Sequence, residues 1–349
     1  MRALVQDRFG EAPEVREVHD ATAPEGGVVV RVEATGLCRS DWHAFAGHDE
    51  DVVLPHVGGH EWAGTVEAVG AGVDAGLLGR RVTAPFVLAC GTCPPCRAGD
   101  QQVCADQLQP GFTGWGSFAE LVAVPRAAVN LVLLPDEVDA GSAALLGCRT
   151  ATAFRALLPV GRLAAGEWLA VHGCGGVGLS AVQVAVAAGA RVVAVDVDDA
   201  ARRRALDLGA VAAVDPGGDG WQAVGERVRD ASDGGTHVSL DALGSEAVVA
   251  ASLAGLRPRG RHVQVGLLPP VLGLPRVPLH LVVAGELEVL GSHGMAAHAY
   301  PALLALVASG RLRPGGLSTR TLALAEAGAA LAAMAGPAPA GVSLVEPGR

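Results

Sequence analysis

Several features are missing from the 349-residue sequence, and each absence narrows what the protein can be. The first ten residues have no apolar core of the kind that a secretory signal peptide needs. Aspartate and glutamate outnumber lysine and arginine by 36 to 26, so the chain lacks the basic excess that binding to nucleic acid or an anionic membrane requires. Only 18% of the residues are charged and half are apolar, which argues against a disordered chain. We therefore expect a folded cytoplasmic protein that binds neither nucleic acid nor membrane.

A long apolar segment that could span a membrane is also missing. Residues 168–190 are the most apolar stretch, but they contain five glycines, a histidine and a glutamine. Their pattern divides naturally into a strand, a turn and a helix. The cysteine count is odd, at seven, and without a secretory signal this indicates a reducing compartment, where clustered cysteines bind metal more often than they form disulfides.

The order of the local patterns predicts two kinds of domain. Short runs rich in valine and glycine at residues 28–32, 64–69 and 80–84 predict strands of a β-rich domain. After about residue 148, alanine-rich helical segments alternate with short valine runs, which predicts a doubly wound α/β domain with a parallel sheet. Its expected strands cover residues 167–172, 191–196, 210–214, 237–241 and 261–265, its expected helices cover 177–188 and 200–208, and two further helices are expected from residue 300 and over 324–334.

A glycine-rich turn lies at the predicted end of the first of these strands. The motif G-x-G-x-x-G opens the helix that follows, and its backbone can approach a pyrophosphate at the helix N-terminus; its candidate residues are Gly173, Gly175, Gly176, Val177 and Gly178. Asp196 falls at the end of the next strand, where a carboxylate accepts hydrogen bonds from a ribose diol and repels the 2′-phosphate of NADP. This favours NAD, although Arg202 lies close enough in sequence to offset the repulsion in part. The alternative is a turn in a Rossmann-like domain that binds no ligand.

Four cysteines are concentrated in fifteen residues. Cys90, Cys93, Cys96 and Cys104 have the spacing C-x2-C-x2-C-x7-C, which can close a tetrahedral zinc site with no open position. Such a site is structural, because substrate cannot displace a ligand. An iron–sulfur cluster or two disulfides are the alternatives.

A second candidate metal site is scattered along the sequence. Cys38, His60 and Cys148 would hold zinc through two thiolates and one imidazole and leave its fourth position free, which is the ligand set of alcohol dehydrogenase. Each residue alone has an ordinary explanation, as a buried free cysteine or a histidine hydrogen-bonded in a turn. Their combination with the cysteine cluster and the glycine-rich turn favours the metal site.

With these motifs in this order, the sequence resembles the zinc-dependent, medium-chain alcohol dehydrogenases over nearly its whole length. The segments that carry the resemblance are Gly36-Leu-Cys-Arg-Ser-Asp-Trp-His43, Gly58-Gly-His-Glu61, the four-cysteine stretch, the glycine-rich turn and Asp241-Ala-Leu-Gly-Ser245. The resemblance implies a GroES-like catalytic domain, a twisted and partly open β-barrel, over residues 1–149 and 292–349. A Rossmann domain over residues 150–291 would be inserted in it. It also implies two zinc ions per chain, NAD and a homotetramer.

The resemblance further implies a role for individual residues. Cys38, His60 and Cys148 match the ligands of the catalytic zinc, and Glu61 matches an acidic neighbour that binds this zinc in some relatives. Asp41 would fix the ring of His60.

Other residues match positions that handle the substrate proton and the cofactor. Ser40 matches the hydroxyl that hydrogen-bonds the alcohol, and His43 matches the outer end of the proton relay. Arg39 would lie near the pyrophosphate, and the main chain around Val265 and Leu267 would hold the nicotinamide carboxamide.

The expected reaction is reversible hydride transfer between an alcohol and NAD. Four aromatic residues are candidates to line the substrate pocket and would favour an apolar primary or secondary alcohol: Trp42, Phe86, Phe112 and Trp115. The alternatives are a polyol or amino-alcohol dehydrogenase, related to the sorbitol or threonine dehydrogenases, and a non-catalytic homologue that binds NAD(P).

Overall fold

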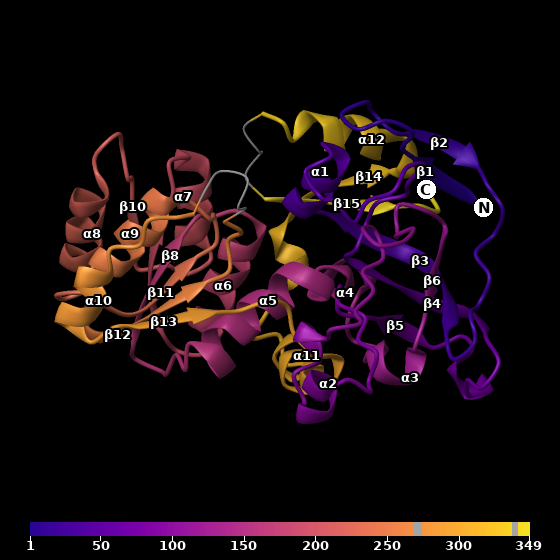
Figure 1. Ribbon diagram of the computed structural model, residues 1–349, viewed down its shortest axis with the longest axis horizontal. Helices are drawn as coiled ribbons and strands as arrows, with labels where there is room; N and C mark the ends of the chain where they lie inside the picture. The colour runs from indigo at the N-terminus through magenta and orange to yellow at the C-terminus, as the bar shows by residue number, and fades with distance from the viewer. Residues whose placement is uncertain (269–273, 337–340) are drawn as a thin grey trace. The chain divides into compact units, whose positions relative to one another are not determined.

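The computed structural model describes residues 1–268, 274–336 and 341–349, and the chain forms two compact units (Figure 1). The first unit comprises Met1–Ala151 and Gly294–Arg349, and the second comprises Thr152–His293. The chain therefore leaves the first unit once and returns to it for its last segment.

The first unit is built on a seven-stranded sheet. Its strand order is β14-β15-β3-β4-β5-β7, and β6 pairs with β3. The strands are β3 (Val28–Leu37), β4 (Trp62–Val69), β5 (Arg81–Thr83), β6 (Leu121–Val124), β7 (Val132–Leu133), β14 (Ser318–Ala323) and β15 (Val342–Glu346), and a separate antiparallel pair is formed by β1 (Arg2–Val5) and β2 (Glu14–Glu17). Strand β3 pairs with β4, β6 and β15, so the returning C-terminal segment is joined directly to the strand that leads to Cys38.

Valine burial explains why β3 is central. Val28, Val29 and Val30 are all almost completely buried, so both faces of the strand are covered. On one face Val28 and Val30 pack with Trp62 of β4 in an apolar cluster. Branched side chains pack well on a pleated surface, and burying each one contributes about 1.5–3 kcal/mol.

Short helices surround this sheet. They are α1 (Arg39–Phe45), α2 (Pro94–Ala98), α3 (Ala127–Asn130), α4 (Ala140–Ala144), α11 (Tyr300–Ala308) and α12 (Leu324–Ala333), with 3₁₀ turns η1 (Ala75–Leu77), η2 (Gln101–Val103), η6 (Ala297–Ala299) and η7 (Pro314–Leu317) and a π-helical turn η3 (Leu146–Thr150). Helix α12 packs through Leu324 and Leu331 against Leu4 of β1. The N- and C-terminal segments therefore share one core.

The second unit is a six-stranded sheet in which every pair is parallel. Its order is β10-β9-β8-β11-β12-β13, the order of a doubly wound dinucleotide-binding sheet. The strands are β8 (Trp168–His172), β9 (Arg191–Val195), β10 (Ala212–Val214), β11 (Thr236–Asp241), β12 (Leu256–Gln264) and β13 (Glu288–Gly291). The helices between them are α6 (Gly176–Ala187), α7 (Asp199–Asp207), α8 (Trp221–Asp230), α9 (Glu246–Ala254) and α10 (Leu279–Gly285). Helix α5 (Ala151–Arg155) and the π-helical turn η4 (Ala156–Val160) precede β8. The predicted α/β architecture is confirmed, and among the described residues no helix has the length and apolar character needed to cross a membrane.

Candidate active site

The structure brings three distant segments of the first unit together around Cys38, His60 and Cys148. Cys38 caps α1 directly after β3, His60 lies two residues before β4, and Cys148 lies in the π-helical turn η3. Potential ligand atoms of these residues and of Glu61 all lie within 4.8 Å of one another, and all four residues are buried. A cluster of two thiols, an imidazole and a carboxylate of this size can hold one metal ion.

Asp41 sets the orientation of His60. Its Oδ1 lies 2.7 Å from Nδ1 of His60, and its Oδ2 accepts the backbone N–H of Cys38 at 2.8 Å. This carboxylate leaves Nε2 of His60 facing the thiols, and that buried atom has no hydrogen-bond partner among the described residues. Because an unpartnered buried nitrogen is costly, a metal ion that accepts its lone pair fits this position.

The pKa values around the cluster indicate an excess of negative charge. Burial opposes a charge on His60, but the Asp41 carboxylate and its hydrogen bond raise the pKa of His60 well above its ordinary value. The hydrogen bond from the Cys148 thiol holds the pKa of Cys38 well below its ordinary value, and the pKa of Cys148 rises in turn. The site therefore favours a cation, and a metal ion would compete there with protons.

An ion pair between Glu61 and Arg149 lies behind the cluster. Nε of Arg149 donates to both carboxylate oxygens of Glu61, at 2.9 and 2.8 Å, and the backbone N–H of Arg149 donates to Oε1 at 2.8 Å. The guanidinium also donates to the carbonyl of Leu37 at 2.9 Å. Leu37, Glu61 and Arg149 are the sequence neighbours of Cys38, His60 and Cys148, so the pair ties the three segments together. Burial raises the pKa of Glu61, and the charge of Arg149 opposes that rise.

Arg149 is the site residue to which the sequence analysis gave no role. The available signal was an arginine directly after Cys148, at the end of the apolar run of residues 143–148. A cation there needs a buried partner, and only the fold shows that the partner is Glu61.

Helix α1 places the expected relay residues beside the cluster. The hydroxyl oxygen of Ser40 lies 3.9 Å from the sulfur of Cys38. Nδ1 of His43 lies 3.2 Å from Nδ1 of His48, a partner that the sequence analysis did not identify. Burial, with the positive charges of His48 and Arg39 nearby, lowers the pKa of His43. Arg39 itself donates to the carbonyl of Met334 and lies over the ring of Trp42 at 5.3 Å.

The four aromatic candidates for the substrate pocket do not all lie together. The rings of Phe112 and Phe86 lie 5.1 and 6.2 Å from the ring of His60, and the ring of Trp42 lies 5.0 Å from that of His43. Trp115 instead donates from Nε1 to the carbonyl of Pro55 at 3.2 Å. It lines a cavity of about 480 Å³ together with N-terminal residues. Two aromatic rings therefore flank His60, and Trp115 belongs to different surroundings.

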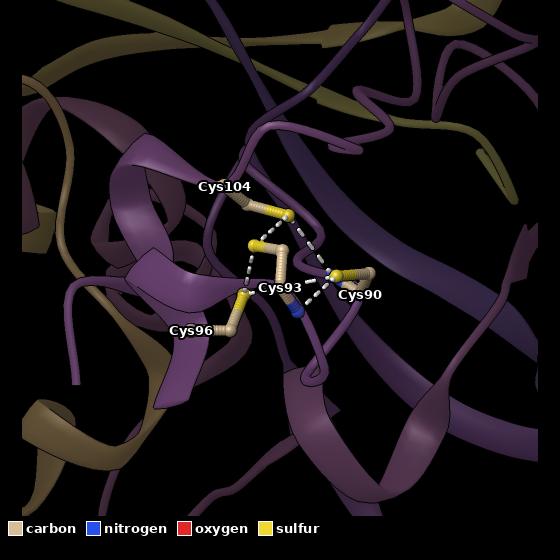
Figure 2. Close-up of side chains that lie close together, drawn as sticks. All are labelled: Cys90, Cys93, Cys96 and Cys104. Atoms are coloured by element: carbon tan, nitrogen blue, oxygen red, sulfur yellow. Dashed lines mark hydrogen bonds between the residues drawn. The ribbon is translucent and has the colours of Figure 1, made fainter. Parts of the chain in front are cut away.

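The four clustered cysteines also converge, and Figure 2 shows their sulfur atoms turned toward one another. The sulfur of Cys93 lies 3.4 Å from that of Cys96 and 3.7 Å from that of Cys104, and the Cys90–Cys96 distance is 3.9 Å. Zinc–sulfur bonds of about 2.3 Å in a tetrahedron give sulfur–sulfur edges of about 3.8 Å, whereas a disulfide needs about 2.05 Å. All seven cysteines are among the described residues, and all are free.

The protein backbone supports charge on this cluster. The N–H groups of Thr92 and Cys93 donate to the sulfur of Cys90, and the N–H of Cys90 donates to that of Cys104. The bonds from the backbone N–H of Thr92, from its hydroxyl and from the N–H of Cys93 lower the pKa of Cys90 to about 6. Such N–H···S bonds are available to a metal thiolate centre before the metal binds.

The glycine-rich turn of the second unit has the geometry that the motif predicts. Gly173 begins the turn after β8 with φ of +92°, and a side chain on Gly178 would collide with the carbonyl of Gly173. The Asp196 carboxylate accepts the N–H of Cys174 at 2.6 Å, which holds it at the turn. Gly175, Gly176 and Val177 form the start of α6 and its N-cap.

Arg202 is engaged in contacts within its own unit. Its guanidinium donates to the carbonyls of Asp196 and Val197 at 2.7 and 3.0 Å, and it pairs with the carboxylates of Asp199 and Asp215 at 3.3 and 3.2 Å. Two carboxylates therefore neutralise the positive charge of Arg202, which was expected to offset the negative charge of Asp196 in part.

The residues whose main chain was expected to hold the nicotinamide carboxamide, Val265 and Leu267, follow β12. The N–H of Val265 donates to the carbonyl of Asp241 at 3.0 Å, and the side chain of Leu267 is 68% exposed.

Comparisons with known proteins agree with this architecture. Residues 24–136 match the family model of the alcohol dehydrogenase GroES-like domain, and residues 176–309 match that of zinc-binding dehydrogenases. An alcohol dehydrogenase of Geobacillus stearothermophilus is 36% identical over 297 residues, which is 84% of each chain. An L-threonine 3-dehydrogenase of Anaeromyxobacter sp. is 36% identical over 234 residues, or 64% of this chain and 65% of the relative.

A solved structure, alcohol dehydrogenase TADH from Thermus sp. ATN1, superimposes with a TM-score of 0.88 at 34% identity and covers 99% of both chains. The fold, the buried cluster and these similarities lead to one conclusion: the chain belongs to the zinc-dependent, medium-chain alcohol dehydrogenase family and is an oxidoreductase of that family.

Proposed function

We propose that the protein catalyses reversible hydride transfer between an alcohol and NAD, with Cys38, His60 and Cys148 as the ligands of a catalytic zinc. The observation that carries this proposal is the buried, unpartnered Nε2 of His60, which faces two thiols. When bound, zinc supplies Lewis acidity, which lowers the pKa of the alcohol substrate. The matched test compares Cys38→Ser with the wild type for zinc content, NADH binding and turnover.

Ser40 and His43 are the residues that we assign to the proton. Ser40 lies next to Cys38, and we assign its hydroxyl to accept the proton of the alcohol. The pKa of His43 is lowered from its ordinary value, which favours the neutral imidazole that a proton acceptor needs. His48 contacts His43, and both imidazoles are exposed, so we assign His48 as the second histidine of the relay. Glu61 would bind zinc only by giving up a bond to Arg149, and its main role is to connect the ligand segments.

A second zinc per chain is proposed at Cys90, Cys93, Cys96 and Cys104. Its support is the near-tetrahedral spacing of the sulfurs and the N–H donors around them. The four thiolates leave no position for substrate, so this zinc is structural.

The preference for NAD over NADP is supported by the contacts of Asp196 and Arg202. Asp196 is fixed at the glycine-rich turn, and Arg202 is already paired with two carboxylates, so a 2′-phosphate would meet net negative charge. Asp196→Ala should raise the NADP to NAD ratio of kcat/KM by about tenfold or more, because it removes a like-charge contact. Asp207→Asn, on the exposed end of α7, is the matched control. An unchanged ratio in Asp196→Ala would rule out this explanation.

An apolar primary or secondary alcohol is the proposed substrate class. Phe86 and Phe112 lie beside His60, and aromatic walls favour apolar groups over the several hydroxyls of a polyol. An amino alcohol is the second candidate, since an L-threonine 3-dehydrogenase is among the relatives. A screen of primary, secondary, aromatic, polyol and amino-alcohol substrates with NAD distinguishes the two.

Assembly as a cytoplasmic homotetramer is also proposed. In the second unit, Leu279 and Val283 of α10 and Val289 of the edge strand β13 are 62%, 78% and 48% exposed. Exposed apolar side chains and the outer edge of a sheet are both suited to contact with a second copy of the chain. Light scattering measures the assembly, and a monomer would contradict it.

The proposed domains are residues 1–149 with 292–349 and residues 150–291. The two compact units of the structure support this division.

A further inference from the structure

A chain of buried polar side chains crosses the second unit, and the proposed reaction does not use it. Ser239 and Ser252 share a hydrogen bond of 2.6 Å between their hydroxyls, and Ser252 Oγ lies 2.7 Å from Nδ1 of His262. Nε2 of His262 lies 3.1 Å from Oε1 of Gln264, and Nε2 of Gln264 donates to Oδ2 of Asp241 at 3.0 Å. Both serines, His262 and Asp241 are completely buried. The chain therefore links β11, α9 and β12 through their side chains.

The partners fix the direction of every bond in this chain. The amide nitrogen of Gln264 donates to Asp241 and to the carbonyl of Gly266, so its carbonyl oxygen faces His262 and must accept. Neutral His262 then donates from Nε2 and accepts at Nδ1 the hydroxyl proton of Ser252. Ser239 donates to Ser252. The amide of Gln264 is therefore held by three partners, Asp241, Gly266 and His262, and loss of the His262 donor would leave its carbonyl oxygen without that hydrogen bond.

The chain ends at two turns at the carboxyl edge of the sheet. Oδ1 of Asp241 accepts the N–H groups of Leu243 and Gly244 at 2.7 and 2.9 Å, which shapes the turn after β11. Gln264 bonds the carbonyl of Gly266 at 2.7 Å, which shapes the turn after β12. A side chain on Gly244 would collide with the carbonyl of Leu267, so the two turns lie against each other.

The position of these turns indicates what they hold. In a doubly wound sheet the ligand lies beyond the carboxyl ends of the strands, and each half of the sheet serves one half of a dinucleotide. The glycine-rich turn and Asp196 follow β8 and β9 and serve the adenosine half. Strands β11 and β12 lie on the other side of β8 and serve the second nucleotide half.

We propose that Gln264, held by Asp241, by the carbonyl of Gly266 and by His262, is a positioning residue for the nicotinamide half of the cofactor. This inference rests on the proposed NAD-linked function. Gln264 need not touch the cofactor, since it sets the main chain of residues 242–244 and 265–267 that faces it. The adenosine half has its own turn and does not depend on this chain.

The experiment separates the two halves by comparing NADH with ADP-ribose, which lacks the nicotinamide ring. In the full-length enzyme, Gln264→Met removes both hydrogen-bonding groups and keeps the length of the side chain. We expect its Kd for NADH to rise about tenfold, as the loss of one or two net hydrogen bonds predicts, and its Kd for ADP-ribose to stay within about twofold. Ser239→Ala, at the far end of the chain, is the matched control and should leave both Kd values within about twofold.

A second pair of variants keeps the proposal testable if Gln264→Met fails to fold. In His262→Gln the longer amide can reproduce the Nε2 donor toward Gln264, whereas the shorter amide of His262→Asn cannot. The Gln variant should retain NADH affinity and the Asn variant should lose it, at similar melting temperatures. Equal weakening of NADH and ADP-ribose binding, or no change in either, would overturn the inference. A wild-type protein that binds no NADH would instead overturn the proposed function.

Discussion

Asp41 shows at the scale of one residue how a metal site can be prepared by the protein alone. Its two oxygens hold the ring of His60 and the backbone of Cys38, two of the three proposed ligands. Asp41→Ala should therefore weaken binding of the catalytic zinc about 10–100-fold, the usual loss when a carboxylate behind a histidine ligand is removed. Competition with a chelator measures this affinity. Asp136→Asn, at an exposed acid that belongs to neither cluster, is the control, and an equal loss in the control would refute the assignment.

Arg149 and Glu61 provide a prediction about stability. Arg149→Met leaves the carboxylate of Glu61 buried without its cation, which should lower the free energy of unfolding by about 3–5 kcal/mol. The double variant Arg149→Met/Glu61→Gln removes both charges and should recover most of that loss. Denaturant unfolding of the metal-free protein, followed for the first unit, measures both. Additive losses in the double variant would show that the two side chains act independently.

For single residues, the sequence predicted which residue types form the proposed zinc site, but it did not predict which side chains pair with one another. The sequence predicted Cys38, His60 and Cys148 as one group because their residue types suit a catalytic zinc, and the fold brings them together. It did not predict that Arg149 would pair with Glu61 or His48 with His43. Such pairs depend on packing between segments, which a local pattern does not encode.

At the scale of elements, the cysteine-rich segment from Cys90 to Cys104 should act as an independent structural module. Pro94 and Pro95 begin α2, with Cys93 as its N-cap, so the loop is stiff before any metal binds. Cys90→Ser should lower the melting temperature by several degrees while NADH binding is retained, because a structural zinc contributes to folding. A thermal melt with and without NADH measures this. An unchanged melting temperature would contradict a structural zinc in this segment.

Several elements with a clear period were predicted well, but the amphipathic helix α8 and some others were missed. The expected helix over 177–188 is α6 (Gly176–Ala187), and the expected strand over 191–196 is β9 (Arg191–Val195). Strand β12 begins at Leu256, five residues before the expected start, because Arg257, Pro258 and Arg259 hide the strand pattern. Helix α9 was not predicted, since its run of alanine and valine is buried on several sides and has no polar stripe.

At the scale of the whole molecule, the residues proposed to bind the catalytic zinc and those proposed to bind the dinucleotide belong to separate units. The proposed zinc ligands all lie in the first unit, and the glycine-rich turn lies in the second. Sequence patterns predicted a β-rich domain followed by an α/β domain, and the family resemblance implied that the second domain is inserted in the first. They could not predict that β15 would pair with β3, because that contact joins residues about three hundred positions apart. The separation means that zinc and NADH binding can be altered one at a time.

The most direct measurement is therefore the zinc content of the wild type and of Cys38→Ser, together with NADH binding and turnover of an alcohol. The two clusters predict two zinc ions per chain in the wild type and one in the variant. The variant should bind NADH with wild-type affinity and show no turnover, because only the first unit is changed. Retention of two zinc ions with full turnover in Cys38→Ser would contradict the account, as would a wild-type protein that turns over alcohols with no zinc at this site.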